Sequence, residues 1–147
     1  LIVMRSTVNP GTCDELSKKY NKRIVMQPEY LGETPAHPML DQKSRQFLVI
    51  GGKPEDRRLL IDLYGSVYNA NTTIRQVTAY EAEVIKLSEN RAIAFKVAEC
   101  QEKRGFNSKC IPKDIYAWCA WAESVGYKPF ITRSILKKNK EWLAQNK

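Results

Sequence analysis

Residues 104–114 read Arg-Gly-Phe-Asn-Ser-Lys-Cys-Ile-Pro-Lys-Asp, a glycine-bearing turn that presents one cysteine and leads through a proline into an amphipathic segment. A cysteine acts as a nucleophile in its thiolate form, and nearby cations or a helix N-terminus stabilise that form. We expect Cys110 to have both, because Lys109 and Lys113 flank it and Pro112 suits the first position of a helix. A single cysteine can equally be a small buried apolar residue. The spacing alone leaves both interpretations open.

The same stretch resembles the catalytic-cysteine motif of the UDP-glucose/GDP-mannose dehydrogenase family, which has roughly the form G-[FY]-G-G-x-C-[FIL]-x-K-D. The matching residues are Gly105, Phe106, Cys110, Ile111, Lys113 and Asp114. Asn107 and Ser108 stand where the family has glycines, so we expect a stiffer loop, although asparagine tolerates left-handed backbone better than most residues. The resemblance implies that Cys110 is a catalytic nucleophile.

Composition describes a globular protein with enough residues to bury a core. The 147 residues are 43% hydrophobic and 27% charged. The sequence contains neither an apolar run of about 18 residues nor a leader typical of secretion, which predicts a cytoplasmic protein without a membrane span. The four cysteines form no C-x-x-C pair and His37 is the single histidine, so we expect reduced thiols and no metal site.

The net charge of +8 allows two interpretations. Such an excess is typical of nucleic-acid-binding proteins. Here the basic residues are spread along the chain, with short runs only at Lys18-Lys19, Arg57-Arg58 and Lys137-Lys138. This favours solvated helix faces, or an anionic ligand such as a nucleotide diphosphate, over a nucleic-acid partner.

The first half of the chain alternates apolar runs with loops and helical segments. Leu1–Met4 and Ile24–Met26 predict strands, the first covered on both faces of a parallel sheet, with a short helix over 13–20 between them. A strand buried on both faces needs neighbours, so we expect the chain to be part of something larger. The loops at 5–12 and 27–34 would follow the carboxyl ends of these strands, where open α/β sheets bind ligands.

A third strand is predicted over 46–52, a helix over 54–64 and a fourth strand over 72–77. The helix has Leu59, Leu60 and Leu63 at core spacing. This order predicts an α/β fold, the second half of a doubly wound sheet, and a G-x-G-x-x-G cradle for a dinucleotide is absent from the sequence.

A helical region follows. The longest helical signal runs over 78–102 and opens with a capping box formed by Thr78 and Glu81. Its apolar residues lie around much of the circumference, which favours a homodimer formed through this helix. Two further helices are predicted over 114–125, ending at Gly126, and over 129–145. Their expected inward residues are Ile115, Trp118, Cys119 and Ala122 in the first, and Ile131, Ile135, Leu136, Trp142 and Leu143 in the second. With the resemblance, this order implies that 1–77 are the carboxyl-terminal half of an NAD-binding Rossmann-like domain and 78–147 a helical central domain that carries the cysteine loop.

Three further motifs are similar to those of the same family. They are S-T-V-x-x-G-T, matched by Ser6, Thr7, Val8, Gly11 and Thr12; P-E-[FY]-L-x-E, matched by Pro28, Glu29, Tyr30, Leu31 and Glu33; and A-E-x-x-K-x-x-x-N, matched by Ala82, Glu83, Lys86 and Asn90. Without this resemblance, Lys86 and Asn90 would be taken for a solvated helix face, and the carboxylates of the loops for solvated groups.

The resemblance implies a role for each matched residue. Lys86 and Asn90 would stabilise oxyanions, Asp114 would position water or assist proton transfer, and Glu29 would act as general acid and base. The residues implied near the cofactor are Ser6, Thr7, Glu33 and Lys113, with Thr7 also implied in catalysis through a bound water. The residues implied at the substrate are Glu29, Tyr30, Leu31, Glu33, Lys86, Asn90, Gly105, Phe106 and Asn107.

The implied reaction is an NAD-dependent oxidation of the C6 alcohol of UDP-glucose to UDP-glucuronate, through a thiohemiacetal and a thioester on Cys110. A dehydrogenase for GDP-mannose or a UDP-N-acetylhexosamine would use the same cysteine. A non-catalytic basic helical module that binds an acidic partner is the alternative outside enzymes. In the family, several tens of residues separate the long helix from the cysteine loop, whereas here Gln101–Arg104 spans that interval, so we expect a shortened or incomplete region.

Overall fold

The computed structural model describes residues 1–30, 46–68, 70–99, 105–107 and 110–145, with the side chains of 90–99 outside the description. The chain divides into two compact units, Leu1–Val84 and Ile85–Lys147. The boundary lies within a single long helix, α3 (Ala79–Glu99), so this helix contributes its first turn and a half to the first unit. The assignment of domains to 1–77 and 78–147 stays a prediction.

A mixed four-stranded sheet forms the first unit. Its strands β1 (Ile2–Met4), β2 (Ile24–Met26), β3 (Phe47–Gly51) and β4 (Thr73–Val77) lie in the order of the sequence. β1 pairs with β2 and β3 with β4 in parallel, while β2 and β3 are antiparallel through Met26 and Gly51. The carboxyl ends of β1 and β2 therefore lie at one edge of the sheet, and those of β3 and β4 at the other.

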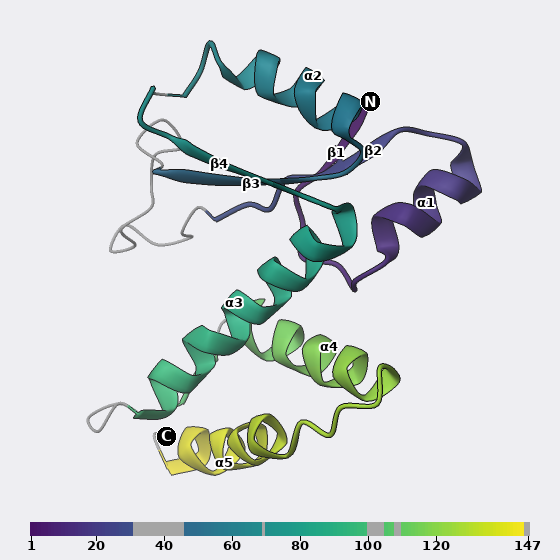
Figure 1. Ribbon diagram of the computed structural model, residues 1–147. Helices are drawn as coiled ribbons and strands as arrows, with labels where there is room; N and C mark the ends of the chain where they lie inside the picture. The colour runs from purple at the N-terminus through teal and green to yellow at the C-terminus, as the bar shows by residue number, and fades with distance from the viewer. Residues whose placement is uncertain (31–45, 69, 100–104, 108–109, 146–147) are drawn as a thin grey trace. The chain divides into compact units, whose positions relative to one another are not determined.

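Alternation along the strands divides the first unit's core between the two faces of the sheet. One face carries Ile24, Met26 and Val49, which pack with α1 (Thr12–Tyr20) and the start of α3. The other carries Val25 and Ile50, which pack with α2 (Pro54–Tyr64). Figure 1 shows α1 and α2 on opposite sides of the sheet. The predicted α/β fold, half of a doubly wound sheet followed by a helical region, is confirmed.

Two expectations about burial in this unit are wrong. Leu1 and Ile2 are 53% and 47% exposed, because β1 has one neighbour in the sheet that the structure describes. In α2 only Leu60 of the three leucines is buried, whereas Leu59 and Leu63 are 50% and 64% exposed. The buried stripe of α2 instead includes Asp56, which pairs with Arg23.

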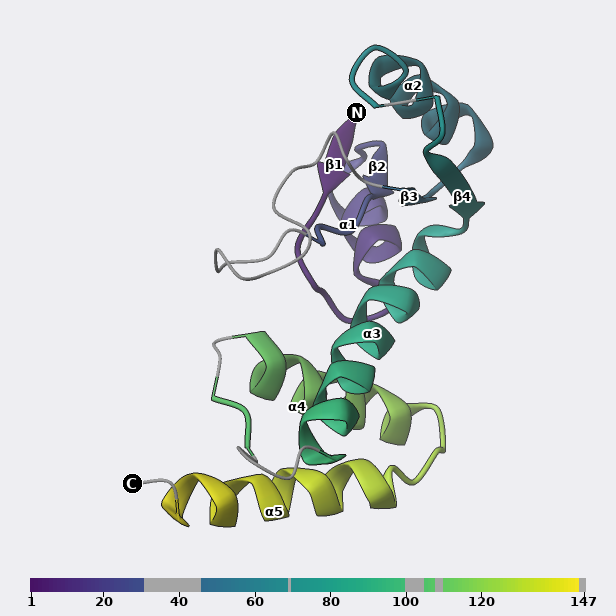
Figure 2. The same cartoon turned by 90° about the vertical axis from the view of Figure 1, so that its left-hand side faces the viewer.

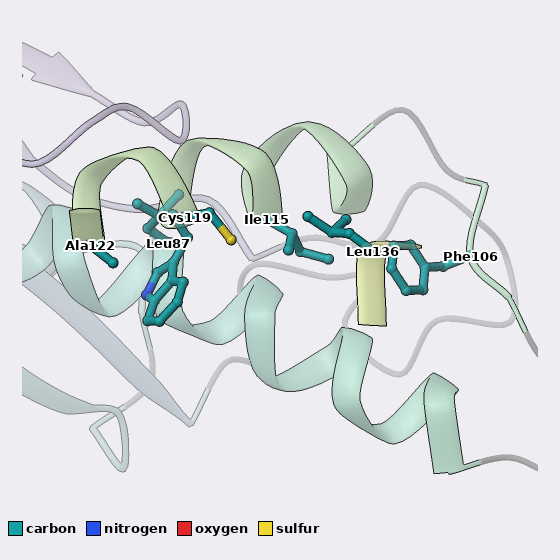
Figure 3. Packing of buried hydrophobic residues seen from close by; sticks show 7 residues of the cluster. Leu87, Phe106, Ile115, Cys119, Ala122 and Leu136 are labelled. Atoms are coloured by element: carbon teal, nitrogen blue, oxygen red, sulfur yellow. The ribbon is translucent and has the colours of Figure 1, made fainter. Parts of the chain in front are cut away.

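The second unit is built from the rest of α3 with α4 (Cys110–Ser124) and α5 (Phe130–Gln145). Figure 2 shows α4 and α5 side by side, joined by a short turn. Leu87 of α3 shares one core with Phe106 and with residues of both other helices (Figure 3). Those residues are Ile115, Trp118, Cys119 and Ala122 of α4 and Leu136 of α5. The predicted inward face of α4 is thus confirmed.

The start of α4 differs from the prediction. The helix begins at Cys110 rather than at Asp114, which makes Pro112 its third residue and not its first. Proline is tolerated there because the first turn of a helix has no internal acceptors for its N–H groups. At the other end, Gly126 has the expected left-handed backbone, with φ +84°.

In α5 the expected inward position of Ile131 is wrong, since this side chain is 62% exposed. The buried polar residues Thr132 and Asn139 occupy this helix's inner face together with Leu136. Among the helices of the described residues, none is both long and apolar enough to cross a membrane.

Candidate active site

The loop after β1 is held to α3 by one buried carboxylate. Glu83, which is fully buried, accepts hydrogen bonds from the backbone N–H groups of Gly11 (2.6 Å) and Cys13 (2.7 Å). These two groups lie at the start of α1, where backbone donors have no partner within the helix. The carboxylate therefore caps α1 and joins the loop that carries Ser6 and Thr7 to the first turns of α3.

Burial raises the pKa of the Cys13 thiol well above its ordinary value, and the hydrogen bond and negative charge of Glu83 add to the effect. The thiol is 1% exposed. Although Cys13 lies in the first turn of a helix, its environment favours the neutral form. This sulfur is therefore unsuited to nucleophilic chemistry.

The loop after β2 is tied to the loop after β1. The Glu29 carboxylate pairs with the guanidinium of Arg5 and accepts a hydrogen bond from the N–H of Tyr30 at 2.7 Å. The Glu29 N–H in turn donates to the Arg5 carbonyl at 3.0 Å. The Tyr30 ring is buried against Phe47, with 5.4 Å between ring centroids.

Four of the predicted residues thus stand at one edge of the sheet, namely Ser6, Thr7, Glu29 and Tyr30. Ser6 is exposed, while Thr7 and Glu29 are half-buried. Leu31 and Glu33 lie outside the described residues. This edge offers hydroxyl and carboxylate groups of intermediate exposure, which suits contact with a polar ligand.

The predicted nucleophile stands at the start of α4. Cys110 is its first residue and is half-buried, in contrast to the fully buried Cys119 of the same helix. Lys113 lies one turn further on, with its side chain 65% exposed. Its ammonium is 3.3 Å from an oxygen of Asp114, whose side chain is 2% exposed. The buried carboxylate of Asp114 therefore offsets part of the stabilisation that the Lys113 charge could give to a thiolate at Cys110.

The predicted oxyanion-stabilising lysine is on the part of α3 that belongs to the second unit. The side chain of Lys86 is 12% exposed, and its ammonium lies 3.6 Å from the carboxylate of Glu89. Its neighbour Leu87 is fully buried against α4. Asn90 lies one turn later on α3, with its side chain outside the description. Direct approach of Lys86 and Asn90 to the Cys110 sulfur stays a prediction.

The segment before α4 is fixed by α5. Asn139 makes two hydrogen bonds to the backbone of Phe106, whose ring is buried in the core. Gly105 has φ +111°, and a Cβ there would lie 3.2 Å from Cδ2 of Leu143. Both the backbone conformation and the close approach of α5 therefore favour glycine at this position. Asn107, the next residue, is exposed.

A pocket at the other edge of the sheet contains none of the predicted residues. It is lined by Asp14, Ser17, Arg23, Ile24, Gly52, Lys53, Pro54, Asp56, Arg57, Thr78 and Ala79. Two of the positively charged side chains in this lining already have partners. Arg23 pairs with Asp56, and Arg57 donates hydrogen bonds to the carbonyls of Gly52 and Val77. The lining is therefore largely structural.

Sequence reasoning missed the anchoring roles of Arg5, Glu83 and Asn139. A signal existed for two of them, since Glu83 and Asn139 are polar residues at positions that helical periodicity assigns to a buried face. Asn139 falls three residues after Leu136, and Glu83 follows Ala79 and Ala82. A polar residue on a buried face requires a partner, and here the partners are backbone groups far away in the sequence.

The fold and these motifs resemble those of nucleotide-sugar dehydrogenases. In sequence, the chain is 25% identical to UDP-glucose 6-dehydrogenase of Rickettsia typhi, over 95% of this chain and 41% of that protein. The resemblance first seen in the motifs is thereby confirmed. No protein-family profile matches the chain.

Solved structures agree on the fold. A UDP-glucose dehydrogenase from Pyrobaculum islandicum matches with a TM-score of 0.81 and 23% identity, over 95% of this chain and 40% of that one. UDP-D-ManNAc dehydrogenase from Pyrococcus horikoshii matches with a TM-score of 0.73 and 20% identity, over 98% and 42%.

The chain spans about two fifths of the length of these relatives. The stretch matched in sequence is 178 residues long, which exceeds the 147 residues of the whole chain. The relative therefore has internal residues without a counterpart in this chain.

Proposed function

We propose that this chain carries the cysteine-bearing part of an NAD-dependent nucleotide-sugar dehydrogenase, with UDP-glucose as the expected substrate. The single observation that supports this most is the coincidence of the four motifs with a fold like that of a UDP-glucose dehydrogenase, at a TM-score of 0.81. Relatives named for UDP-glucose and for UDP-D-ManNAc make other nucleotide sugars the nearest alternatives.

In the proposed reaction, Cys110 explains how an aldehyde is carried on to an acid. The thiolate adds to the carbonyl carbon of the aldehyde formed from the C6 alcohol, which makes a thiohemiacetal. Loss of a hydride from that carbon and of the proton from its hydroxyl group leaves a thioester. Water then attacks the thioester, the acid departs and the sulfur returns as the thiolate. The half-buried position of Cys110 is compatible with this cycle, because the sulfur must be reached by the sugar.

The other predicted residues would act on the same carbon. The Lys86 ammonium and the Asn90 amide would stabilise the negative charge that develops on the oxygen, a task for preorganised donors. Asp114, buried near the start of α4, would orient the attacking water. Glu29 would take up and return a proton, and its carboxylate is held in place by the pairing with Arg5.

This chain would supply only part of a cofactor site. The Gly11 and Cys13 N–H groups at the start of α1 are taken by Glu83, so this turn does not fit the pyrophosphate of a dinucleotide. By the resemblance, Thr7 and Glu33 would hold water and the nicotinamide ribose side, with Ser6 and Lys113 near the cofactor; of these, Ser6 is exposed and Thr7 is half-buried. NAD+, when bound, would accept one hydride in each of the two oxidation steps.

The experiment that tests the proposal measures NAD+ reduction by the full-length protein with a panel of nucleotide sugars. We expect two NADH per sugar and formation of the acid with UDP-glucose, and we expect Cys110→Ser to form none. Absence of NADH with every sugar, together with salt-sensitive association with polyanions, would instead favour the basic binding module. We also propose that the protein forms a homodimer through its long helix, as expected from the sequence, and sedimentation of the same sample tests this.

A further inference from the structure

Asn139 uses both polar atoms of its side-chain amide on one residue of a distant loop. It lies in the middle of α5 and is 6% exposed. Its Oδ1 accepts the Phe106 N–H at 2.7 Å, and its Nδ2 donates to the Phe106 carbonyl at 3.1 Å. A residue of a neighbouring β-strand makes the same pair of bonds, so the amide takes the place of a strand partner.

Two other contacts hold the same segment. The Phe106 ring is 4% exposed and packs in the core with Ile115 and Leu136 (Figure 3). Gly105 lies close to Leu143 of α5, where a Cβ would make a tight contact of 3.2 Å with Cδ2, and its φ of +111° is one that other residues rarely adopt. Residues 105 and 106 are thus held through both backbone and side chain, while Asn107 beside them is exposed.

We propose that Asn139 is a positioning residue, which holds residues 105–107 in one conformation as a preformed wall for the nucleotide sugar. The identity of the ligand rests on the proposed function, whereas the anchoring rests on the two hydrogen bonds. Removal of the amide leaves the buried N–H and carbonyl of Phe106 without these partners, which is costly for the held conformation. If residues 105–107 had to become ordered when the sugar binds, affinity for the sugar would be lower. We therefore expect loss of the amide to raise KM more than it lowers kcat.

The decisive variants are Asn139→Leu, which removes both bonds at similar volume, and Asn139→Asp, which keeps only an acceptor when ionised. Leu136→Ala is the matched control, because it weakens the same core from the same helix and leaves both bonds in place. The first readout is hydrogen exchange at the Phe106 amide, compared with amides in the middle of α4. The second is KM and kcat of the full-length protein with UDP-glucose.

We expect Asn139→Leu to accelerate exchange at Phe106 about tenfold beyond the change in α4, and to raise KM by a similar factor with a smaller effect on kcat. Leu136→Ala should lower the melting temperature but accelerate exchange at Phe106 less than Asn139→Leu does, because it removes packing around the ring and leaves both hydrogen bonds in place. In Asn139→Asp, protection should recover as the pH falls, after correction for intrinsic exchange rates, because a protonated carboxyl again offers one donor and one acceptor.

Equal effects of Asn139→Leu and Leu136→Ala on both readouts would overturn the proposal. If Asn139→Leu does not fold, failure of protection to recover at low pH in Asn139→Asp overturns it instead. A wild-type protein that oxidises no nucleotide sugar refutes the proposed function and this ligand, while the exchange data still decide whether Asn139 anchors the segment.

Discussion

Two helices of this protein begin beside a cysteine, and the two starts differ in what surrounds the sulfur. At α1, the buried Glu83 carboxylate takes the N–H groups of Gly11 and Cys13, and the Cys13 thiol is enclosed. At α4, Cys110 is half-buried and is followed one turn later by an exposed lysine. A helix N-terminus by itself therefore does not make a thiol reactive. The charge and the access around it decide.

The largest expected effect is a difference in enzymatic activity between variants of Cys110 and of Cys13. Cys110→Ser should abolish acid formation in the full-length protein, because the serine hydroxyl is far less nucleophilic than a thiolate near neutral pH. Cys13→Ala should retain most of the activity, since this sulfur is enclosed. Acid formation is measured with NAD+ and UDP-glucose. Full turnover by Cys110→Ser would remove the proposed mechanism.

Alkylation of the native protein sharpens the same contrast. We expect iodoacetamide to modify Cys110 at least about 100-fold faster than Cys13. The reagent needs a thiolate that it can reach, whereas Cys13 is buried and its environment favours the neutral thiol. Peptide mass spectrometry at successive times gives both rates. In urea the two rates should converge. Comparable native rates would show that the enclosure of Cys13 opens readily.

Glu83 tests how the α1 start is held. Glu83→Leu leaves two backbone N–H groups without their acceptor, which should lower the free energy of unfolding by about 2–5 kcal/mol. Glu83→Gln keeps one acceptor oxygen and should lose less. Urea titrations of both variants measure the difference. Equal stability of Glu83→Leu and wild type would contradict the capping role.

Alkaline pH gives a smaller effect at the same place. Because the pKa of Cys13 is raised on folding, the unfolded state loses this proton above about pH 9 while the folded state keeps it. The stability that depends on the neutral thiol is therefore present below pH 9 and falls above it, by at most about 1.4 kcal/mol per pH unit. Urea midpoints at pH 8 and pH 10 measure the fall. Cys13→Ala should make it shallower.

The smallest expected effect concerns a helix start that is capped from within its own turn. At α3, Thr78 Oγ1 accepts the Glu81 N–H at 3.2 Å, and the Glu81 carboxylate accepts the Thr78 N–H at 2.8 Å. Thr78→Ala should cost about 1 kcal/mol of stability, as is typical of an N-cap. A loss of stability as large as that of Glu83→Leu would show that the local cap of α3 and the long-range cap of α1 stabilise the protein equally.

Most elements could be predicted from the sequence because their signals are local. The capping box of α3 and the left-handed Gly126 after α4 are formed as expected, since each depends on residues within one turn. The predicted start of α4 was wrong because proline is acceptable at several positions of the first turn of a helix, so Pro112 did not fix where the helix begins. The exposure of Leu59 and Leu63 escaped prediction because spacing identifies an apolar stripe but not the surface that covers it.

The candidate site was predicted only in part, for a related reason. Motifs identify Cys110, Lys86 and Glu29 as chemical groups, but no local pattern reveals the partners that hold them. Arg5 pairs with Glu29 from 24 residues away, and Asn139 reaches Phe106 across 33. Contacts of this kind form only when loops and helices are brought together by packing.

The sequence by itself determined where helices and strands form and which residue types could do chemistry, because periodicity, caps and motifs act over a few residues. Only the tertiary structure decided which of the two helix starts keeps an accessible thiol. Glu83 is separated from Gly11 by 72 residues and from Cys13 by 70, so its carboxylate reaches the α1 donors only after α3 has packed on the sheet. Burial and partnership, which set the reactivity of each sulfur, are properties of that packing.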